Sequence, residues 1–242
     1  MSTAVMMERI AEASPRLKAR MAGVFELLEA LTSGFGQVIV PGMLVVAGNA
    51  KATAANILAH GLLFRLSILA ALIGVACHIA WIFLFYELFK PVNRSLSLLA
   101  AFVGLVAIAI QACSSLFQVA PLIVMEAGQS FSAFNVDQLQ ALTLMSLRFS
   151  ARAFNTYLAF FGIWCVLMGY LIFRSTFMPR IIGVLEAFAG LCWLTFLWPP
   201  LGHYLSPYNQ VLSAPGELSL MLWLLVMGVN SQRWNEQASL GR

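Results

Sequence analysis

The sequence predicts an all-α protein, a six-helix transmembrane bundle. Of its 242 residues, 61% are hydrophobic and only 10% are charged, a composition far outside that of soluble globular domains. The apolar residues gather in six long stretches, and a helix needs about 20 mostly apolar residues to cross a bilayer. These stretches are continuous rather than alternating, which favours helices over the strands of a barrel.

The six stretches occupy residues 22–46, 62–89, 96–125, 153–173, 181–198 and 216–230. The last two are short and are expected to gain turns from the adjoining loops. The chain then divides into three parts: an amphipathic cytoplasmic lead-in at 1–20, a six-helix transmembrane domain at 21–231 and a short cytoplasmic tail at 232–242. No room is left for a soluble domain.

Two segments between the spans have recognisable helix signals. Residues 49–60 are rich in alanine, with Thr53 as a candidate N-cap, and are expected to form a short helix on the outer surface. Residues 135–173 contain no Gly or Pro before Gly162, so they are expected to form one continuous helix. Its N-cap would be Asn135 or Ser132.

Residues 199–215 have a different composition. Four prolines and two tyrosines predict an ordered outer loop with aromatic anchors at the level of the lipid headgroups.

The positive charges predict the orientation in the membrane. Ten basic residues fall on one side of the predicted bundle: Arg9, Arg16, Lys18, Arg20, Lys90, Arg94, Arg174, Arg180, Arg233 and Arg242. The other side has only Lys51, Arg65, Arg148 and Arg152. Because positive residues concentrate in cytoplasmic loops, both termini are expected in the cytoplasm. This topology explains the net charge of +4, so no nucleic-acid partner is expected.

The four cysteines predict neither a disulfide framework nor a metal site. Cys77, Cys113, Cys165 and Cys192 each fall in a different span, where a thiol behaves as a small apolar side chain. The sequence has no CxxC pair and no Cys/His spacing suited to zinc. It also has no recognisable catalytic motif, so no metal and no cofactor are expected.

A weak internal similarity links two of the outward-going spans. RSLSLLAAFVGL at 94–105 and RIIGVLEAFAGL at 180–191 agree at six of twelve positions, each after a short basic turn that contains proline. Shared composition of apolar helices is one explanation. The other is a duplicated helical hairpin, with spans 2–3 matching spans 4–5.

Polar residues form a stripe on each of three spans. The stripes are Glu26, Glu29, Ser33 and Gln37 on span 1, Gln111, Ser114, Ser115 and Gln118 on span 3, and Asp137, Arg148, Arg152 and Asn155 on the fourth helix. Polar groups in a bilayer are costly, so these stripes are expected to face one another. They would either join the helices by hydrogen bonds or line a cavity. The alternative for the two glutamates is to extend toward Lys18 and Arg20 at the cytoplasmic surface.

Charged residues of the outer half form the candidate ligand site. Arg65, Arg148, Arg152 and Glu217 are expected at similar depth, and three arginines against one acid suit a phosphate, a carboxylate or a lipid headgroup. Deeper in the same site we expect His78, Gln111, Gln118 and Asn155. The alternative is that these arginines pair with Glu217 and Asp137 and only anchor their helices.

Three segments resemble a family of integral membrane proteins. They are ATAANILAHGLLFRLSILAAL at 52–72, FYELFKPVNRSLSLLAAF at 85–102 and ELSLMLWLLVMGVN at 217–230. They are similar to the bacterial integral membrane proteins of domain-of-unknown-function family 4386. This resemblance implies a six-helix protein of the bacterial inner membrane and implies no activity.

Three functions are compatible with these features. The first is binding of a small amphipathic or lipid-like anionic ligand in an outer-leaflet polar pocket. The second is transport of a small molecule, which the candidate repeat and the polar stripes favour. The third is a membrane-embedded enzyme for an apolar substrate, with His78, Glu186 or Glu217 as acid or base. The partner is expected to be a membrane lipid or a small amphipathic ligand, and a homo-oligomer stays open.

Overall fold

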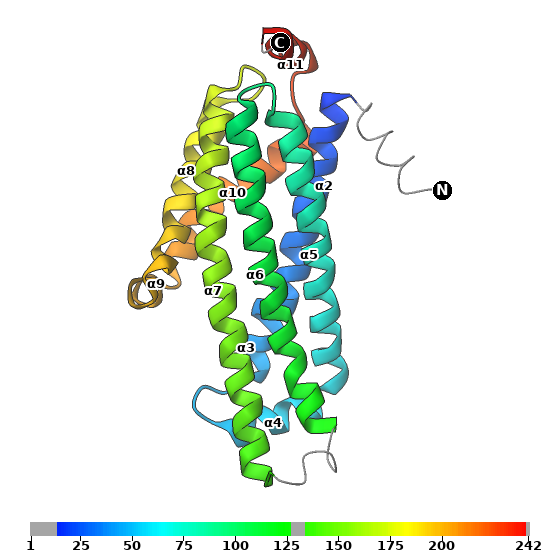
Figure 1. The fold of residues 1–242 in the computed structure, drawn as a ribbon, viewed down its shortest axis with the longest axis vertical. Helices are drawn as coiled ribbons and strands as arrows, with labels where there is room; N and C mark the ends of the chain where they lie inside the picture. The colour runs from blue at the N-terminus through cyan, green and yellow to red at the C-terminus, as the bar shows by residue number, and fades with distance from the viewer. Residues whose placement is uncertain (1–13, 127–133, 241–242) are drawn as a thin grey trace, which may run out of the picture. The chain divides into compact units, whose positions relative to one another are not determined.

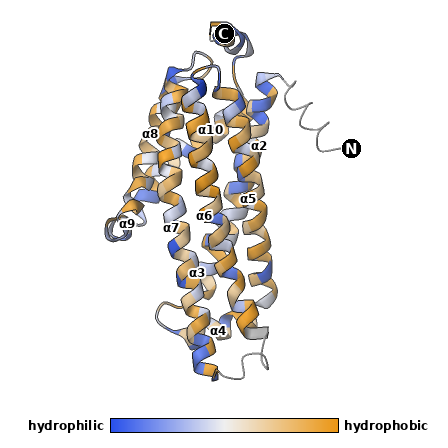
Figure 2. Cartoon of the chain, in the orientation of Figure 1, coloured by the Kyte–Doolittle hydropathy of each residue, from blue (hydrophilic) through white to orange (hydrophobic). Residues whose placement is uncertain are grey.

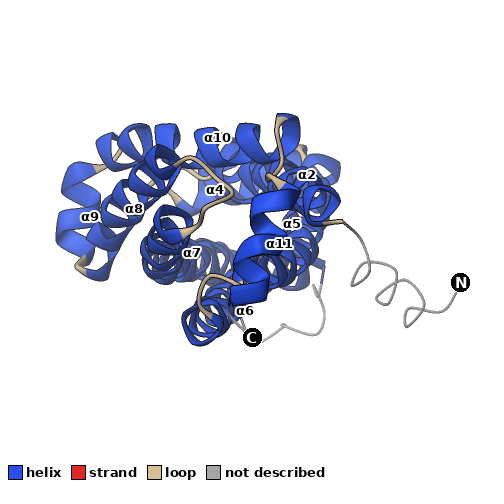
Figure 3. Ribbon diagram, turned by 90° about the horizontal axis from the view of Figure 1, so that it is seen from above, coloured by secondary structure: helices blue, strands red, loops and turns tan. Residues whose placement is uncertain are grey.

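The computed structural model describes residues 14–126 and 134–240, and every regular element in those two ranges is a helix (Figures 1 and 3). The order is α2 (Pro15–Ser33), the π-helix η1 (Gly34–Ile39), α3 (Val40–Leu44), α4 (Ala50–Ala59), α5 (Gly61–Phe89), α6 (Arg94–Glu126), α7 (Val136–Arg174), α8 (Arg180–Leu194), the short 3-10 helix η2 (Thr195–Leu197), α9 (Pro199–Leu205), α10 (Tyr208–Val226) and α11 (Ser231–Leu240). Most of the predicted lead-in, residues 1–13, and the candidate cap Ser132 lie outside the described residues.

Five helical segments are long and apolar enough to cross a membrane, and their bodies are coloured as hydrophobic in Figure 2. They are Pro15–Leu44, Gly61–Phe89, Arg94–Val124, Val136–Arg174 and Arg180–Leu197. A sixth candidate is the pair α10 and α11, which are bent by 104° at the break between them. The all-α fold and the multi-pass membrane character that the sequence predicts are therefore confirmed.

The described chain forms two compact units. The first comprises 14–27, His78–Ala107 and 158–240, and the second comprises Leu28–Cys77 together with the described part of Ile108–Tyr157. Consequently α2, α5, α6 and α7 each contribute residues to both units.

Each unit has its own buried core. In the second unit Val40, Leu44, Ile57, Phe64 and Ile68 pack together with Leu147.

In the first unit the core is aromatic. The rings of Trp81 and Trp164 lie 4.8 Å apart, and Phe85 packs 5.3 Å from the ring of Trp164. Because large aromatic side chains dominate burial, this cluster fixes α5 against α7.

Glycines bring α7 and α8 into backbone contact. A Cβ atom added at Gly169 would lie 2.6 Å from the carbonyl oxygen of Gly183, and one added at Gly162 would lie 2.8 Å from that of Gly190. The two pairs are spaced seven residues apart on antiparallel helices, so the contact repeats every two turns. Small residues that allow such close approach are typical of helix pairs in membranes.

The structure confirms the continuous fourth helix and corrects one predicted cap. At the start of α7 the amide N–H of Gln138 donates to Asn135 Oδ1 at 2.9 Å, and the N–H of Asn135 donates to Gln138 Oε1 at 2.8 Å. This is a reciprocal capping box. The short helix predicted at 49–60 is α4, but its N-cap is Asn49, which accepts from the N–H of Ala52. The predicted cap, Thr53, is buried and bonds to the backbone of Val46 instead.

The predicted outer loop at 199–215 is wrong in its conformation, because most of it is helical. Pro199 and Pro200 occupy the first turn of α9, where a missing N–H costs nothing. Pro207 stands at the N-cap of α10, and Pro215 lies inside that helix. The last span consequently begins at Tyr208 rather than near residue 216.

Candidate functional site

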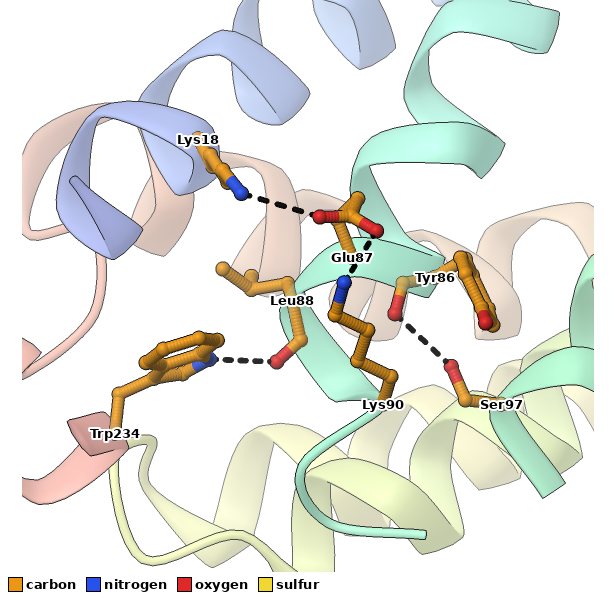
Figure 4. Close-up of polar contacts among 7 residues, drawn as sticks. All are labelled: Lys18, Tyr86, Glu87, Leu88, Lys90, Ser97 and Trp234. Atoms are coloured by element: carbon orange, nitrogen blue, oxygen red, sulfur yellow. Dashed lines mark hydrogen bonds and ion pairs between the residues drawn. The ribbon is translucent and has the colours of Figure 1, made fainter. Parts of the chain in front are cut away.

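The ends of α2, α5, α6 and α11 meet around one buried carboxylate in the first unit (Figure 4). Glu87, near the end of α5, accepts from Lys18 Nζ of α2 at 3.2 Å and from Lys90 Nζ at 2.6 Å. The side chains of Lys18 and Glu87 are only 6% and 12% exposed, whereas that of Lys90 is 39% exposed. One acid is thus shared by a buried and a surface cation.

A tryptophan ties α11 to the same place. Trp234 donates its indole N–H to the carbonyl oxygen of Leu88 at 2.8 Å, as Figure 4 shows. The last carbonyls of a helix lack partners within the helix, so this bond satisfies one of them at the end of α5. Beside it, the hydroxyl of Ser97 in α6 donates to the carbonyl oxygen of Tyr86 at 3.3 Å. These bonds position α11 over the turn between α5 and α6.

A pocket of about 850 Å³ opens between this turn and α11. It is lined by Tyr86, Lys90, Pro91, Val92, Asn93, Arg94, Ser95, Trp234, Asn235, Ala238 and Ser239. We call it the basic pocket, because its charged lining residues are Lys90 and Arg94. Arg94 is exposed, and its guanidinium makes no ion pair with any residue of the two described ranges. Glu87 therefore pairs with two cations, Lys18 and Lys90, while Arg94 lines the pocket without an ion pair in the described ranges.

An apolar groove of about 650 Å³ adjoins the basic pocket. It is lined by Leu96 and Leu99 of α6, by Val166, Leu167 and Tyr170 of α7, and by Asn93 and Ser95. The last two residues also line the basic pocket, so the two hollows share a border. A polar pocket joined to an apolar groove is complementary to an amphipathic molecule, which has a polar part and an apolar part.

In the second unit the polar stripes of the first and third spans face each other, as predicted. Gln111 Nε2 of α6 donates to Glu29 Oε1 and to Ser33 Oγ of α2, at 3.1 Å each. Gln37 Nε2 donates to Ser115 Oγ at 3.0 Å. Lys18 bonds to Glu87, and Arg20 donates to the carbonyl oxygen of Val226. The alternative for Glu26 and Glu29, an extension toward Lys18 and Arg20, stays a prediction.

The fourth helix joins this network through a residue outside its predicted stripe. Ser150 exchanges hydrogen bonds with Ser114, its hydroxyl donating to the carbonyl oxygen of Ser114 at 2.9 Å. Asn155 is half-buried, and Arg148, Arg152 and Asp137 are exposed. Ser150 lies between the two arginines in sequence, on the inward face that the serines of α6 require. A single serine in a helix is too common for the sequence alone to identify Ser150 as a contact between helices.

The members of the predicted outer site occupy different surroundings. Arg65, Arg148 and Arg152 are exposed residues of the second unit. Glu217 of α10, in the first unit, accepts a hydrogen bond from the indole N–H of Trp193 in α8. The convergence of the arginines with Glu217 stays a prediction.

Two further candidates from the sequence lie in the interior of the first unit. His78 is fully buried, and its ring packs 4.5 Å from that of Trp81 and 6.0 Å from that of Phe161. Glu186 is 1% exposed, and its carboxylate oxygen Oε2 has no hydrogen-bond partner in the described chain. In residues 14–126 and 134–240 no group of three or more His, Cys, Asp or Glu side chains is arranged to hold a metal ion.

Sequence reasoning used Lys90 and Arg94 only as markers of topology and did not single out Trp234. The signal available was one tryptophan within a polar tail, where such a residue needs an apolar surface and an acceptor.

Comparison with known proteins identifies one family. No curated protein and no solved structure matches the chain. One family model, described as a domain of unknown function (DUF4386), matches residues 21–228, which is most of the chain and contains all the candidate spans except the first residues of α2 and the helix α11. The chain belongs to this family, DUF4386.

Proposed function

We propose that the protein binds an anionic phospholipid of the bacterial inner membrane, with the headgroup in the basic pocket and an acyl chain in the adjoining groove. The observation that carries the proposal is the shared border at Asn93 and Ser95 between a pocket lined by two cations and a groove lined by apolar side chains. The class of ligand is the one that the sequence predicts. The proposed site differs from the outer site that the sequence predicts, because Lys90 and Arg94 line a pocket of suitable size.

The charges around the pocket favour an anion. The lining of the pocket has two cations, Lys90 and Arg94, and no acid, and Lys90 shares the carboxylate of Glu87 with Lys18. The guanidinium of Arg94 has no acidic partner in the described chain, and its planar fork matches the oxygens of a phosphate. The pocket also contains the first residues of α6, where unpaired backbone N–H groups and the helix dipole attract negative charge.

The position in the membrane supports the same ligand. If both termini are cytoplasmic, the basic pocket faces the cytoplasmic leaflet, whose anionic lipids attract nearby lysine and arginine by about 1 kcal/mol per residue. The groove between α6 and α7 then lies at the depth of the acyl chains. Leu99 and Tyr170 are about half exposed there, at 49% and 51%, which leaves an apolar surface for a chain to cover.

Lipid retention measured by native mass spectrometry tests this proposal. We expect the wild-type protein, purified in mild detergent, to retain phosphatidylglycerol in preference to phosphatidylcholine. Arg94→Ala should weaken this retention roughly ten- to a hundredfold, because a hydrogen bond to a charged group contributes about 1.5–3 kcal/mol. Arg174→Ala is the matched control, since Arg174 is an exposed arginine at the end of α7 that does not line the basic pocket.

Two further outcomes separate the sources of the phosphate. Free glycerol phosphate that competes as well as the lipid would show that the groove does not contribute, and that the ligand is a soluble phosphate. Equal retention of anionic and zwitterionic lipids by all three proteins would refute the proposal.

A further inference from the structure

A second candidate site lies in the second unit, where η1 of the first span packs against α6. The polar contacts form a ladder that climbs both helices in register. Gln111 bonds to Glu29 and Ser33, and Gln37 bonds to Ser115. One turn further along α6, Gln118 Nε2 donates to the carbonyl oxygen of Gly36, the residue before Gln37, at 2.7 Å. All of these groups lie within two candidate spans.

The bonds fix which atom of each glutamine amide remains open. The carbonyl oxygen of Gly36 can only accept, so the Nε2 group of Gln118 must face it and Oε1 must point elsewhere. The hydroxyl of Ser115 donates to the carbonyl oxygen of Gln111 at 3.3 Å, so it accepts from Gln37 Nε2. In both amides the oxygen is therefore the free atom.

These two oxygens, Gln37 Oε1 and Gln118 Oε1, are buried and have no hydrogen-bond partner in residues 14–126 and 134–240. Gln118 is 1% exposed. Gly36 and Gln37 are adjacent in η1, and Ser115 and Gln118 are three residues apart in α6, so both amides lie within one turn of each helix. A buried polar group without a partner is strongly disfavoured, and these two can be satisfied only by a donor or a cation.

The backbone at this level departs from a regular α-helix. Residues Gly34–Ile39 form a π-helix within the first span, a feature found frequently at functional sites. At Gly36 a Cβ would collide with the carbonyl oxygen of Ser67 and with Ala71 of α5, so the wider turn lies directly against that helix. Irregular turns in membrane helices are tolerated where they line a site, and their carbonyl groups coordinate cations in transporters.

The chemistry of the ladder suits a cation, because its open atoms are oxygens. Its one ionisable group is Glu29, a half-buried carboxylate that receives a hydrogen bond from the neutral amide of Gln111. The remaining members of the ladder are amides, hydroxyls and a backbone carbonyl. Hard oxygen ligands of this kind suit alkali and alkaline-earth ions. The two open atoms, Gln37 Oε1 and Gln118 Oε1, are neutral amide oxygens, and neutral oxygen ligands suit a monovalent ion better than a divalent one.

We infer that Gln37 Oε1 and Gln118 Oε1 are ligands of a monovalent alkali cation bound between η1 and α6. This site is independent of the basic pocket, because every residue that forms it belongs to the second unit and every pocket residue belongs to the first. It gives the polar stripes of the first and third spans a chemical purpose, and it favours ion-coupled transport as a second role.

Thermal unfolding of the purified protein in detergent tests the inference. The wild-type Tm should rise saturably with NaCl against choline chloride at equal ionic strength, by about 2–4 °C at saturation. Gln37→Leu and Gln118→Leu should each abolish this sodium-dependent rise, whatever they do to the Tm itself. Gln210→Leu, at an exposed position of α10, is the matched control and should keep it.

If Gln118→Leu does not fold, the binding of radioactive sodium to the wild-type protein tests the inference instead. A Tm that is identical in sodium, potassium and choline, together with no bound sodium, would overturn the inference and assign a water molecule to the two oxygens. A sodium-dependent rise that survives in both variants would overturn it as well. Arg94→Ala should leave the effect unchanged, so the inference can fail without affecting the proposed lipid site.

Discussion

Glu87 holds Lys18 and Lys90 at once, with one carboxylate oxygen 3.2 Å from the first ammonium and the other 2.6 Å from the second. These contacts join the start of α2 to the turn that precedes α6, although Lys18 and Glu87 are 69 positions apart in the sequence. This shared acid sets the position of Lys90 at the edge of the basic pocket. The position of Lys90 therefore depends on an acid whose side chain is only 12% exposed.

Glu87→Gln should therefore destabilise the protein. The neutral amide leaves Lys18, with its side chain only 6% exposed, without its anionic partner, and loss of a hydrogen bond between charged groups costs about 1.5–3 kcal/mol. Chemical unfolding in detergent micelles measures the difference. Glu236→Gln, an exposed acid of α11, is the control and should change stability by less than about 0.5 kcal/mol. Equal effects of the two substitutions would show that the Glu87 contacts are not structural.

Trp234→Phe should loosen α11 without unfolding the bundle. The substitution keeps an aromatic ring but removes the donor to the carbonyl oxygen of Leu88, a loss of about 1 kcal/mol. Hydrogen exchange of the α11 amides should become several-fold faster, while exchange in α5 away from its last turn stays unchanged. Faster exchange throughout α5 would mean that the tryptophan supports the whole unit rather than the position of α11.

Gly169→Val should disrupt the packing of α7 on α8. Its Cβ would lie 2.6 Å from the backbone of Gly183, and backbone atoms cannot move aside without separating the helices. Overpacking of this kind costs about 1–3 kcal/mol or more. Gly61→Ala, where a Cβ meets nothing within 4 Å, should be neutral or slightly stabilising. Thermal unfolding monitored by the far-ultraviolet circular dichroism of both variants decides whether the glycine contact supports the fold.

The charge distribution leads to a prediction about orientation. Single cysteines placed at Val92 and at Ser206 in a background without cysteine should react from opposite sides of the membrane, Val92 from the cytoplasm. A cysteine at Ala47 can report the outer side as well. The neighbouring position Gly48 is less suitable, because its φ of +75° disfavours any side chain. Labelling of Val92 from outside intact cells would invert the proposed topology and remove the basic pocket from the cytoplasmic leaflet.

The fold could be predicted from sequence because membrane insertion depends on local composition. Long apolar runs and the position of basic residues suffice for spans such as Gly61–Phe89 and Arg94–Val124. The segment 199–215 was misjudged since proline is unfavourable inside a helix but tolerated in its first turn, and only the register of the helix separates the two cases.

The candidate site was less accessible to such reasoning. The facing stripes on the first and third spans followed from helical periodicity, which places Glu29 and Ser33 on one face. The basic pocket did not, because it depends on the 104° bend between α10 and α11 that returns Trp234 to the end of α5. A bend at a loop of a few residues has no periodic signal.

The most direct test of the central claim is a titration of delipidated protein with phosphatidylglycerol, with the dissociation constant measured for the wild type and for a variant with both Lys90→Ala and Arg94→Ala. The proposed site predicts saturable binding at one lipid per chain that is weakened at least about tenfold in the double variant and unchanged in Arg174→Ala. Identical dissociation constants for all three proteins would contradict it.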